Sequence, residues 1–243
     1  MFIEHKYLRF KGLNLTLETL DGLLKHSGSL VNKSKMNRLI SIKNFKNKIN
    51  FNQYPSLEAQ ISSLSDDIAY NNHDIQDGIK AKLFSFKELI EIDFFNEIYK
   101  SNKQNLKRKN LDILIYQIIR DSIDLMVKDL INNTINNIQK YKIKSIKGVY
   151  NCPETLVSFS NKFKKIEKEI KFFLRLKMYN NKNVLLKNNK GKKIVKYLFN
   201  EISKKPNKFF NKEQVKKNKF RTISDYIAGM TDRYAINLYN ILK

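Results

Sequence analysis

The chain has few of the residues that make turns, with 7 glycines and 3 prolines among its 243 residues. Because strands need turns and turns draw on these two residues, their scarcity favours long helices joined by short polar connections. No apolar run approaches the roughly 20 residues needed to span a bilayer. The first ten residues contain no uninterrupted apolar segment of the kind found in a signal peptide. Cys152 is the single cysteine, which excludes an internal disulfide. We therefore expect an all-α, cytoplasmic protein with no membrane partner.

Acidic residues are also scarce, since 47 Lys and Arg against 23 Asp and Glu give a formal net charge of +24. The excess falls almost wholly in residues 101–243. Such a basic half attracts nucleic acid and steers anionic ligands such as nucleoside triphosphates. A Lys-, Asn- and Ile-rich composition of the kind that AT-rich coding produces explains the charge equally well. The charge shift near residue 105 is the best candidate for a domain boundary.

Apolar residues recur at helical spacing over most of the chain. Helices are expected at 14–27, 55–80, 87–102 (one or two), 108–145, 154–178, 194–204 and 222–242, with a loop or short hairpin at 180–193. Asn14 or Thr16 is expected to cap the first of these helices. In the long helix the residues expected to face inward are Leu111, Leu114, Ile118, Leu125, Ile131, Ile135 and Ile138. In 154–178 they are Phe159, Phe163, Ile166, Ile170, Phe173 and Leu174.

The segment 55–80, PSLEAQISSLSDDIAYNNHDIQDGIK, is the most informative helix. At about 100° per residue its apolar residues fall within one narrow stripe. That stripe consists of Leu57, Ile61, Leu64, Ile68, Ile75 and Ile79. The opposite side carries Asp66, Tyr70, Asp74 and Asp77, with His73 beside them. A carboxylate row with a tyrosine suits a cleft that holds a divalent cation and a sugar. An ordinary amphipathic helix with a solvated acidic face has the same periodicity, so both interpretations stay open.

Three segments lie in a characteristic order: GLNLTLETLDGLLKHSG (12–28), PSLEAQISSLSDDIAYNNHDIQDGI (55–79) and RTISDYIAGMTDRYA (221–235). Together they resemble the dGTPase-like deoxynucleoside triphosphate triphosphohydrolases of the HD superfamily. The resemblance spans nearly the whole chain, although 81–220 matches only in helical character. It implies an HD-superfamily helical domain, N-terminally truncated, with long C-terminal helices. Residues 1–105 would be the remainder of the catalytic helical domain, and 106–243 a basic helical region that packs on it.

In that family two histidines and two aspartates hold a divalent metal such as Mg²⁺ or Mn²⁺, and the last aspartate belongs to a DDIAY motif, here residues 66–70. We assign the metal ligand to Asp66, because it shares a face with Tyr70 and Asp74. Asp67 points about 100° away and is a secondary candidate. The resemblance implies that Tyr70 and Asp74 bind the deoxyribose near its 3′-hydroxyl. A phenol can stack on the sugar and donate to it, while a carboxylate accepts from the hydroxyl.

The histidines do not rebuild the family's metal site. His73-Asp74 lies downstream of the DDIAY motif, whereas the family's His-Asp pair lies well upstream of it. His5, His26 and His73 have no spacing that restores the set. His26 follows the last apolar turn of its helix, where a role at the helix end is favoured over a ligand role. The family's first histidine, its His-Asp pair and its catalytic His/Glu segment all precede the GLNLT stretch, so we expect the chain to be inactive alone.

The closing motif is expected to form one helix that is mostly core. Its apolar stripe consists of Ile223, Ile227, Met230, Tyr234, Leu238 and Ile241. A glycine in a helix interior costs about 1 kcal/mol relative to alanine, so Gly229 suggests a close contact with another helix. The polar remainder consists of Arg221, Asp225, Asp232 and Arg233. Structural salt bridges and direct contacts to substrate both remain open for these four residues.

The resemblance implies hydrolysis of a dNTP, with dGTP the expected substrate, to a deoxynucleoside and tripolyphosphate. A metal-activated water would attack the α-phosphorus. The chain would be the C-terminal part of such an enzyme and would form a homo-oligomer. The alternative is a non-catalytic helical module that binds single-stranded nucleic acid or joins a full-length paralogue. A decaying gene product that does not fold stably is a third interpretation.

Overall fold

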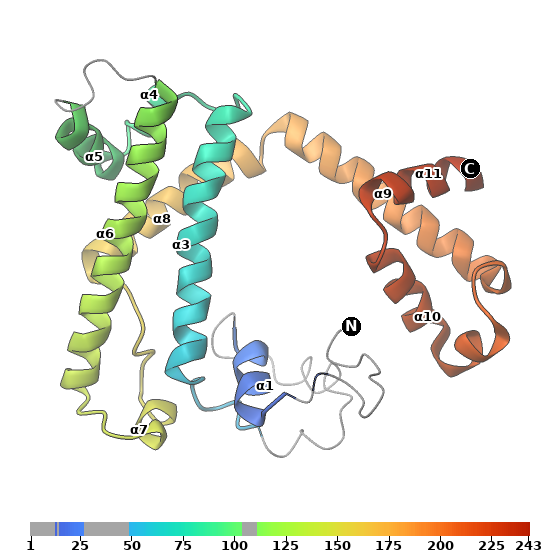
Figure 1. Cartoon of the computed structure of the whole chain (residues 1–243), viewed down its shortest axis with the longest axis horizontal. Coiled ribbons are helices and arrows are strands. Elements are labelled where there is room, and N and C mark those ends of the chain that lie inside the picture. The colour runs from blue at the N-terminus through green and yellow to red at the C-terminus, as the bar shows by residue number, and fades with distance from the viewer. Residues whose placement is uncertain (1–12, 14, 27–48, 104–110) are drawn as a thin grey trace. The chain divides into compact units, whose positions relative to one another are not determined.

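The computed structural model describes residues 13, 15–26, 49–103 and 111–243 (Figure 1). Every regular element in these residues is a helix, which confirms the all-α expectation. Within the same residues, no helix combines the length and the apolar character that crossing a membrane requires. The chain divides into two compact units, with the boundary after Met178. The charge shift near residue 105 therefore falls inside the first unit, and the functional division at that point stays a prediction.

The first unit contains α1 (Leu17–Leu24), α3 (Leu57–Lys80), α4 (Phe86–Leu89), α5 (Asp93–Lys103), α6 (Leu111–Lys140), α7 (Ile146–Tyr150) and α8 (Asn161–Leu174). Helix α8 continues into a π-helical turn, η2 (Arg175–Tyr179). Helices α3 and α6 run side by side in opposite directions, and α8 packs against α3 (Figure 1). The amide of Asn72 on α3 lies 3.6 Å from the sulfur of Met126 on α6, deep in this interface.

Short polar side chains set the starts of the helices. The hydroxyl of Thr16 accepts a hydrogen bond from the Thr19 amide, so the expected cap of α1 is confirmed. Asn14, the other expected cap, lies outside the described residues. Ser56 caps α3 in the same way by accepting from the Ala59 amide. Ser85 and Glu88 form a reciprocal capping box at α4. These caps satisfy amides that would otherwise lack partners at each helix start.

The core of the first unit gathers apolar side chains from α3, α4, α5, α6 and α8. On α3 the expected stripe is largely confirmed, because Ile68 and Ile75 are buried. Ile61 departs from it and is exposed. The residues expected to face inward in 154–178 are all buried or half-buried. The hydrophobic core therefore holds α3 with one face inward and the acidic face outward.

The expected inward face of α6 is wrong. Its buried residues are Ile115, Ile118, Ile119, Ser122, Met126 and Leu130. Of the expected set Ile118 is buried, whereas Leu111, Leu125, Ile131 and Ile135 are exposed. The physical reason is that α6 carries apolar residues on two opposite faces, so periodicity alone does not determine which of them is packed.

The start of α8 was expected too early. Residues 154–160 are not helical, and α8 begins at Asn161, where the Ser160 hydroxyl accepts from the Phe163 amide. Gln60 of α3 holds the preceding segment, because its side-chain oxygen accepts from the amides of Leu156 and Val157 at 3.0 and 3.1 Å. These long-range hydrogen bonds compete with helix formation there, and no local pattern reveals them.

The second unit contains α9 (Lys182–Lys204), a short 3₁₀ turn η3 (Pro206–Lys208), α10 (Lys212–Ala228) and α11 (Asp232–Leu242). Its core is formed by Ile194, Leu198, Ile202 and Ile223. The loop or hairpin expected at 180–193 is wrong, because Asn181 caps α9 and the helix runs without interruption through that stretch. Lysine and leucine are good helix formers, which explains why the Lys/Asn-rich segment continues the helix.

The single helix expected at 222–242 is also wrong. Gly229 ends α10, and Thr231 caps α11 by accepting from the Tyr234 amide. A Cβ added at Gly229 would meet carbonyl oxygens of Asp225 and Tyr226 at ordinary distances, so the expected close helix contact is absent at this residue. The new cap divides the expected apolar stripe. Ile223 is buried, but Tyr234 and Ile241 are exposed.

Candidate functional site

The candidate site lies on the outward face of α3. Asp66, Tyr70 and Asp74 follow one another at four-residue spacing, so their side chains share one side of the helix. Tyr70 is 63% exposed, whereas Ile75 on the opposite side is fully buried. The acidic row therefore faces outward while the apolar stripe anchors α3 in the core. Its carboxylates and phenol are accessible for binding a ligand.

Asp66 has a neighbour that the sequence did not indicate. The Nε2 atom of His26 lies 3.7 Å from Oδ2 of Asp66, and both side chains are about half exposed. His26 lies just after the C-terminal end of α1, as the sequence predicts. Its imidazole nevertheless faces the carboxylate that we assigned as the metal ligand. No spacing rule relates these two residues, because the contact depends on how α1 packs on α3.

Two contacts hold His26 near Asp66. The hydroxyl of Ser63 donates a hydrogen bond to the main-chain oxygen of His26, with an oxygen–oxygen distance of 2.6 Å. Helix α1 also approaches α3 closely at Gly22, where an added Cβ would lie 2.9 Å from the Cβ of Ala59. A larger side chain at Gly22 would push the two helices apart. Glycine at this position therefore permits the packing that brings His26 over α3.

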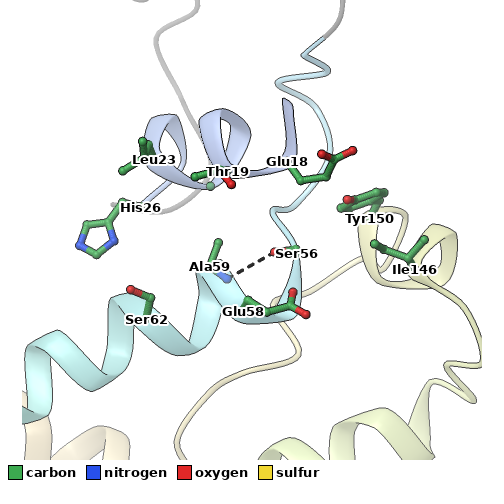
Figure 2. Close-up of a pocket in the computed structure, with 11 residues that line it drawn as sticks. Glu18, Thr19, Leu23, His26, Ser56, Glu58, Ala59, Ser62, Ile146 and Tyr150 are labelled. Carbon is green, nitrogen blue, oxygen red and sulfur yellow. Dashed lines mark hydrogen bonds between the residues drawn. The ribbon is translucent and has the colours of Figure 1, made fainter. Parts of the chain in front are cut away.

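A pocket of about 460 Å³ adjoins His26 (Figure 2). Its walls come from α1, from the first turns of α3 and from α7. The residues that line it are Glu18, Thr19, Gly22, Leu23, His26, Ser56, Glu58, Ala59, Ser62, Ile146 and Tyr150. Figure 2 shows Tyr150 and Ile146 on one side and His26 on the other. Ser62, the lining residue of α3 that is nearest to Asp66 in the sequence, lies one helical turn before it.

The charges in this pocket are mostly acidic. The main-chain N–H of Glu58 and the Ser56 hydroxyl lower the pKa of the Glu58 carboxyl. Burial, followed by the charges of Asp21, Glu18 and Glu58, raises the pKa of the Tyr150 phenol. At neutral pH the pocket therefore presents carboxylates together with a protonated phenol. This chemistry favours ligands with hydroxyl or cationic groups over a bare phosphate.

Asp67 does not share the outward row with Asp66. Its Oδ2 atom accepts a hydrogen bond from Nζ of Lys171 on α8 at 3.1 Å, and Lys171 also pairs with Glu167. Burial opposes charge on Lys171, but the hydrogen bonds that its ammonium donates to Glu167 and Asp67 outweigh this effect and raise the lysine pKa. This pairing agrees with the different direction of Asp67 on the helix and gives it a structural partner.

The polar residues of the closing motif lie in the second unit. Arg221 Nε donates to both carboxylate oxygens of Asp225 at 2.9 and 3.0 Å, within α10. Asp232 lies in the first turn of α11, where a negative charge is favourable. Arg233 follows it and is exposed. These positions fit a structural role for the motif and leave contacts to substrate as a prediction.

A hydroxyl pair joins the two helices of the closing motif. The hydroxyl groups of Tyr226 on α10 and Tyr234 on α11 lie 3.0 Å apart. That hydrogen bond, together with burial, raises the pKa of Tyr226 to about 12. The hydroxyl of Tyr197 on α9 donates to the main-chain oxygen of Leu242. The Tyr226–Tyr234 pair of the motif therefore joins α10 to α11, and Tyr197, outside the motif, joins α9 to α11.

The described residues do not form a complete metal site. Among them, no set of three or more His, Cys, Asp or Glu side chains is placed to hold a metal ion. His26 and Asp66 are two groups of suitable chemistry, whereas a hydrolytic metal centre usually needs at least three protein ligands. His73 is exposed beside the acidic row, and His5 lies outside the described residues. The described residues therefore supply too few ligands to hold a hydrolytic metal by themselves.

Comparison with known proteins identifies the family. Residues 157–241 match the model of the phosphohydrolase-associated domain. A deoxyguanosinetriphosphate triphosphohydrolase-like protein of Pelagibacter ubique (strain HTCC1062) is 68% identical over 238 residues, which cover 98% of this chain and 64% of the relative. Its counterparts in Rickettsia bellii (strain RML369-C) and Rickettsia typhi (strain ATCC VR-144 / Wilmington) are 36% identical, over 99% of this chain and 64% of their own length.

The chain belongs to the deoxyguanosinetriphosphate triphosphohydrolase-like family of HD phosphohydrolases. It spans 64% of the length of these relatives, and their greater length is consistent with a match to their C-terminal portion.

Proposed function

We propose that this chain forms part of a metal-dependent enzyme that hydrolyses a dNTP, dGTP first among them, to a deoxynucleoside and tripolyphosphate. The observation that carries the proposal is the outward row of Asp66, Tyr70 and the half-buried Asp74 on α3, with the His26 imidazole 3.7 Å from Asp66. The names of the relatives support the substrate class. A divalent metal would supply an activated water and stabilise charge on the phosphate.

In this proposal the chain's own residues recognise the sugar. Tyr70 is exposed enough for its ring to stack on a deoxyribose, and its hydroxyl can donate to the 3′ oxygen. Asp74 lies one helical turn further, where its carboxylate can accept from the 3′-hydroxyl. Asp66 and His26 lie one turn in the other direction, toward the phosphates. We propose that the described residues alone do not hydrolyse dNTPs, since their ligand set is too small.

The proposal is tested by reading the DNA upstream of the Met1 codon in all three forward frames. Codons for a histidine and a His-Asp pair, in frame or one frameshift away, support it. The longer chain that they encode is then expected to release tripolyphosphate from dGTP in the presence of Mn²⁺. Asp66→Ala is expected to abolish this release, and Tyr70→Ala is expected mainly to raise KM. Absence of such codons, or a longer chain that is inactive, contradicts the catalytic proposal.

A second function, binding of single-stranded nucleic acid, is favoured by the outward face of α9. The core positions of this helix are Ile194, Leu198 and Ile202, and exposed lysines lie on its other sides. These are Lys182, Lys187, Lys190, Lys192, Lys193 and Lys196. Lysines spaced along a helix can neutralise successive phosphates, and their binding weakens steeply as salt is raised. If Lys193→Glu with Lys196→Glu leaves the affinity and the salt dependence for an oligonucleotide unchanged, this function is excluded for α9.

A further inference from the structure

The pocket beside α1 is acidic at one end, although the chain as a whole is strongly basic. Glu18 and Glu58 lie toward the end that Tyr150 lines, away from His26 (Figure 2). None of the described residues that line this pocket is a lysine or an arginine, in a chain that contains 47 of them. The wall therefore holds no such cation to neutralise the two carboxylates, and they can attract a positively charged ligand.

Tyr150 adds an aromatic ring and a hydroxyl to the acidic end. Within the part of the chain that the structure describes, its hydroxyl has no hydrogen-bond partner. After burial, the charges of Asp21, Glu18 and Glu58 contribute to the raised pKa of this phenol, so these carboxylates lie near it. Ammonium groups bind over the face of a tyrosine ring, and carboxylates accept hydrogen bonds from them. The acidic end thus has the groups that recognise an amine.

Contacts outside the pocket hold Tyr150 in place. The main-chain N–H of Tyr54 donates to the main-chain oxygen of Tyr150 at 3.3 Å. The side chain of Gln53 donates to the side-chain oxygen of the next residue, Asn151, at 2.8 Å. Both bonds join the end of α7 to the segment that leads into α3. A site whose walls are held before the ligand arrives loses little freedom on binding, so a small ligand can gain affinity from it.

The remainder of the pocket suits a chain of methylene groups. Leu23, Ala59 and Ile146 present aliphatic side chains to a volume of about 460 Å³, which is the size of a site for a small organic molecule. A bare metal ion would leave most of this volume empty, and the carboxylates would repel a phosphate. Asp66 provides a further carboxylate, about 12 Å along α3 from Glu58. Two acidic places separated by an apolar wall match a flexible chain with an ammonium group at each end.

We propose that this pocket binds an aliphatic polyamine, with one ammonium group held by Glu18, Glu58 and Tyr150. A second ammonium group reaches toward Asp66, and the methylene groups between them cover the apolar wall. The exposed ion pairs are weak one by one, so the affinity depends on their combination with the aromatic ring. The ligand is neither a dNTP nor a metal. Its binding can therefore be measured without either of them, separately from the proposed function.

The experiment is isothermal titration calorimetry of the full chain with spermidine, in a metal-free buffer at neutral pH. We expect one spermidine to bind per chain. Glu18→Gln and Glu58→Gln are each expected to weaken binding about threefold to fivefold, because each removes the charge of one exposed ion pair. The double variant should bind about tenfold more weakly. Glu97→Gln, at an exposed position of α5 outside the pocket, removes the same charge and should leave the affinity unchanged.

A series of probes separates a polyamine site from a site for any cation. Butylamine carries one ammonium group and is expected to bind more weakly than spermidine, and hexanediol, which carries none, should not bind. Tyr150→Leu should weaken spermidine binding about twofold to fivefold, since it removes the ring and keeps an apolar side chain. Circular dichroism checks that each variant keeps its helices.

Absence of spermidine binding overturns the proposal. So does an unchanged affinity in the double glutamate variant, an equal loss in Glu97→Gln, or equal binding of butylamine. Displacement of spermidine by Mg²⁺ at the same concentration also overturns it, because the pocket would then select positive charge alone.

Discussion

Nε2 of His26 lies 3.7 Å from Oδ2 of Asp66, although the two residues are far apart in the chain. One comes from the end of α1 and the other from the middle of α3. The Ser63 hydroxyl, which holds the main chain of His26, fixes this relationship independently of the imidazole. Asp66 therefore meets a second group that can bind a metal or a phosphate, and this contact is accessible to direct measurement.

Added Mn²⁺ should affect the side of α3 that carries Asp66 and not the side that carries Asp67. If Asp66 binds a divalent cation beside His26, added Mn²⁺ is expected to broaden the imidazole NMR signals of His26 more than those of His73. Asp66→Asn is expected to remove the selective broadening at His26. Asp67→Asn should leave it unchanged, because Asp67 points toward Lys171. Equal broadening at His26 in the wild type and in Asp66→Asn would show that Asp66 does not hold the cation.

Gly78 is expected to tolerate no side chain. An added Cβ would overlap the ring of Phe84, a buried core residue, so Gly78→Ala must displace that ring. Overpacking of this kind costs about 1–3 kcal/mol. Gly191→Ala is the matched control, because an added Cβ there meets nothing within 4 Å in the middle of α9. It should stabilise α9 by up to about 1 kcal/mol.

Hydrogen exchange measures the effects of Gly78→Ala and Gly191→Ala separately, because the α3 amides report on the first unit and the α9 amides on the second. Protection should fall in α3 for Gly78→Ala and rise in α9 for Gly191→Ala. Unchanged protection of α3 in Gly78→Ala would show that Phe84 can move at no cost.

The α3 helix shows what the sequence can predict. The expected helix 55–80 agrees with the observed α3 at its end and begins two residues before the observed start at Leu57, and its outward row follows from the apolar periodicity. Signals of this kind are local, because each depends on residues within one or two turns. The family motifs lie on α1, α3, α10 and α11, and the comparisons confirm the family that they indicated.

The errors arise where the deciding contact is distant in the chain. The amides of Leu156 and Val157 bond to Gln60, so the start of α8 depends on α3. Helix α6 has apolar residues on two faces, and its partners determine which face is packed. The approach of His26 to Asp66 depends on the close packing of Gly22 against Ala59. None of these contacts has a signature in local periodicity.

Gln60 is expected to be the most sensitive polar residue of the first unit. Its amide group is buried, accepts from Leu156 and Val157, and donates to the main-chain oxygen of Pro55 at 2.9 Å. Gln60→Ala leaves these main-chain groups without partners, which should cost about 3 kcal/mol in the free energy of unfolding.

Urea denaturation followed by circular dichroism checks the size of this loss. Gln139→Ala, on an exposed position of α6, is the control and should change stability by less than about 0.5 kcal/mol. Limited proteolysis should cut residues 154–160 faster in Gln60→Ala than in the wild type. Equal cleavage rates would mean that Gln60 does not hold the segment.

The ion pair between α4 and η2 should make stability depend on acid. Nζ of Lys177 donates to Glu88 at 2.7 Å, and this bond, followed by the main-chain N–H and the hydroxyl of Ser85, lowers the pKa of Glu88 from 4.5 to about 2. A lowered pKa means that the ionised carboxylate favours the folded state. Its contribution is complete above pH 4.5 and is lost as the pH falls toward 2.

Carbon-detected NMR should therefore give a midpoint near 2 for the titration of the Glu88 carboxyl. Lys177→Met should move that midpoint upward, whereas Glu169→Gln, on the exposed face of α8, should not; an ordinary midpoint in the wild type would contradict the ion pair.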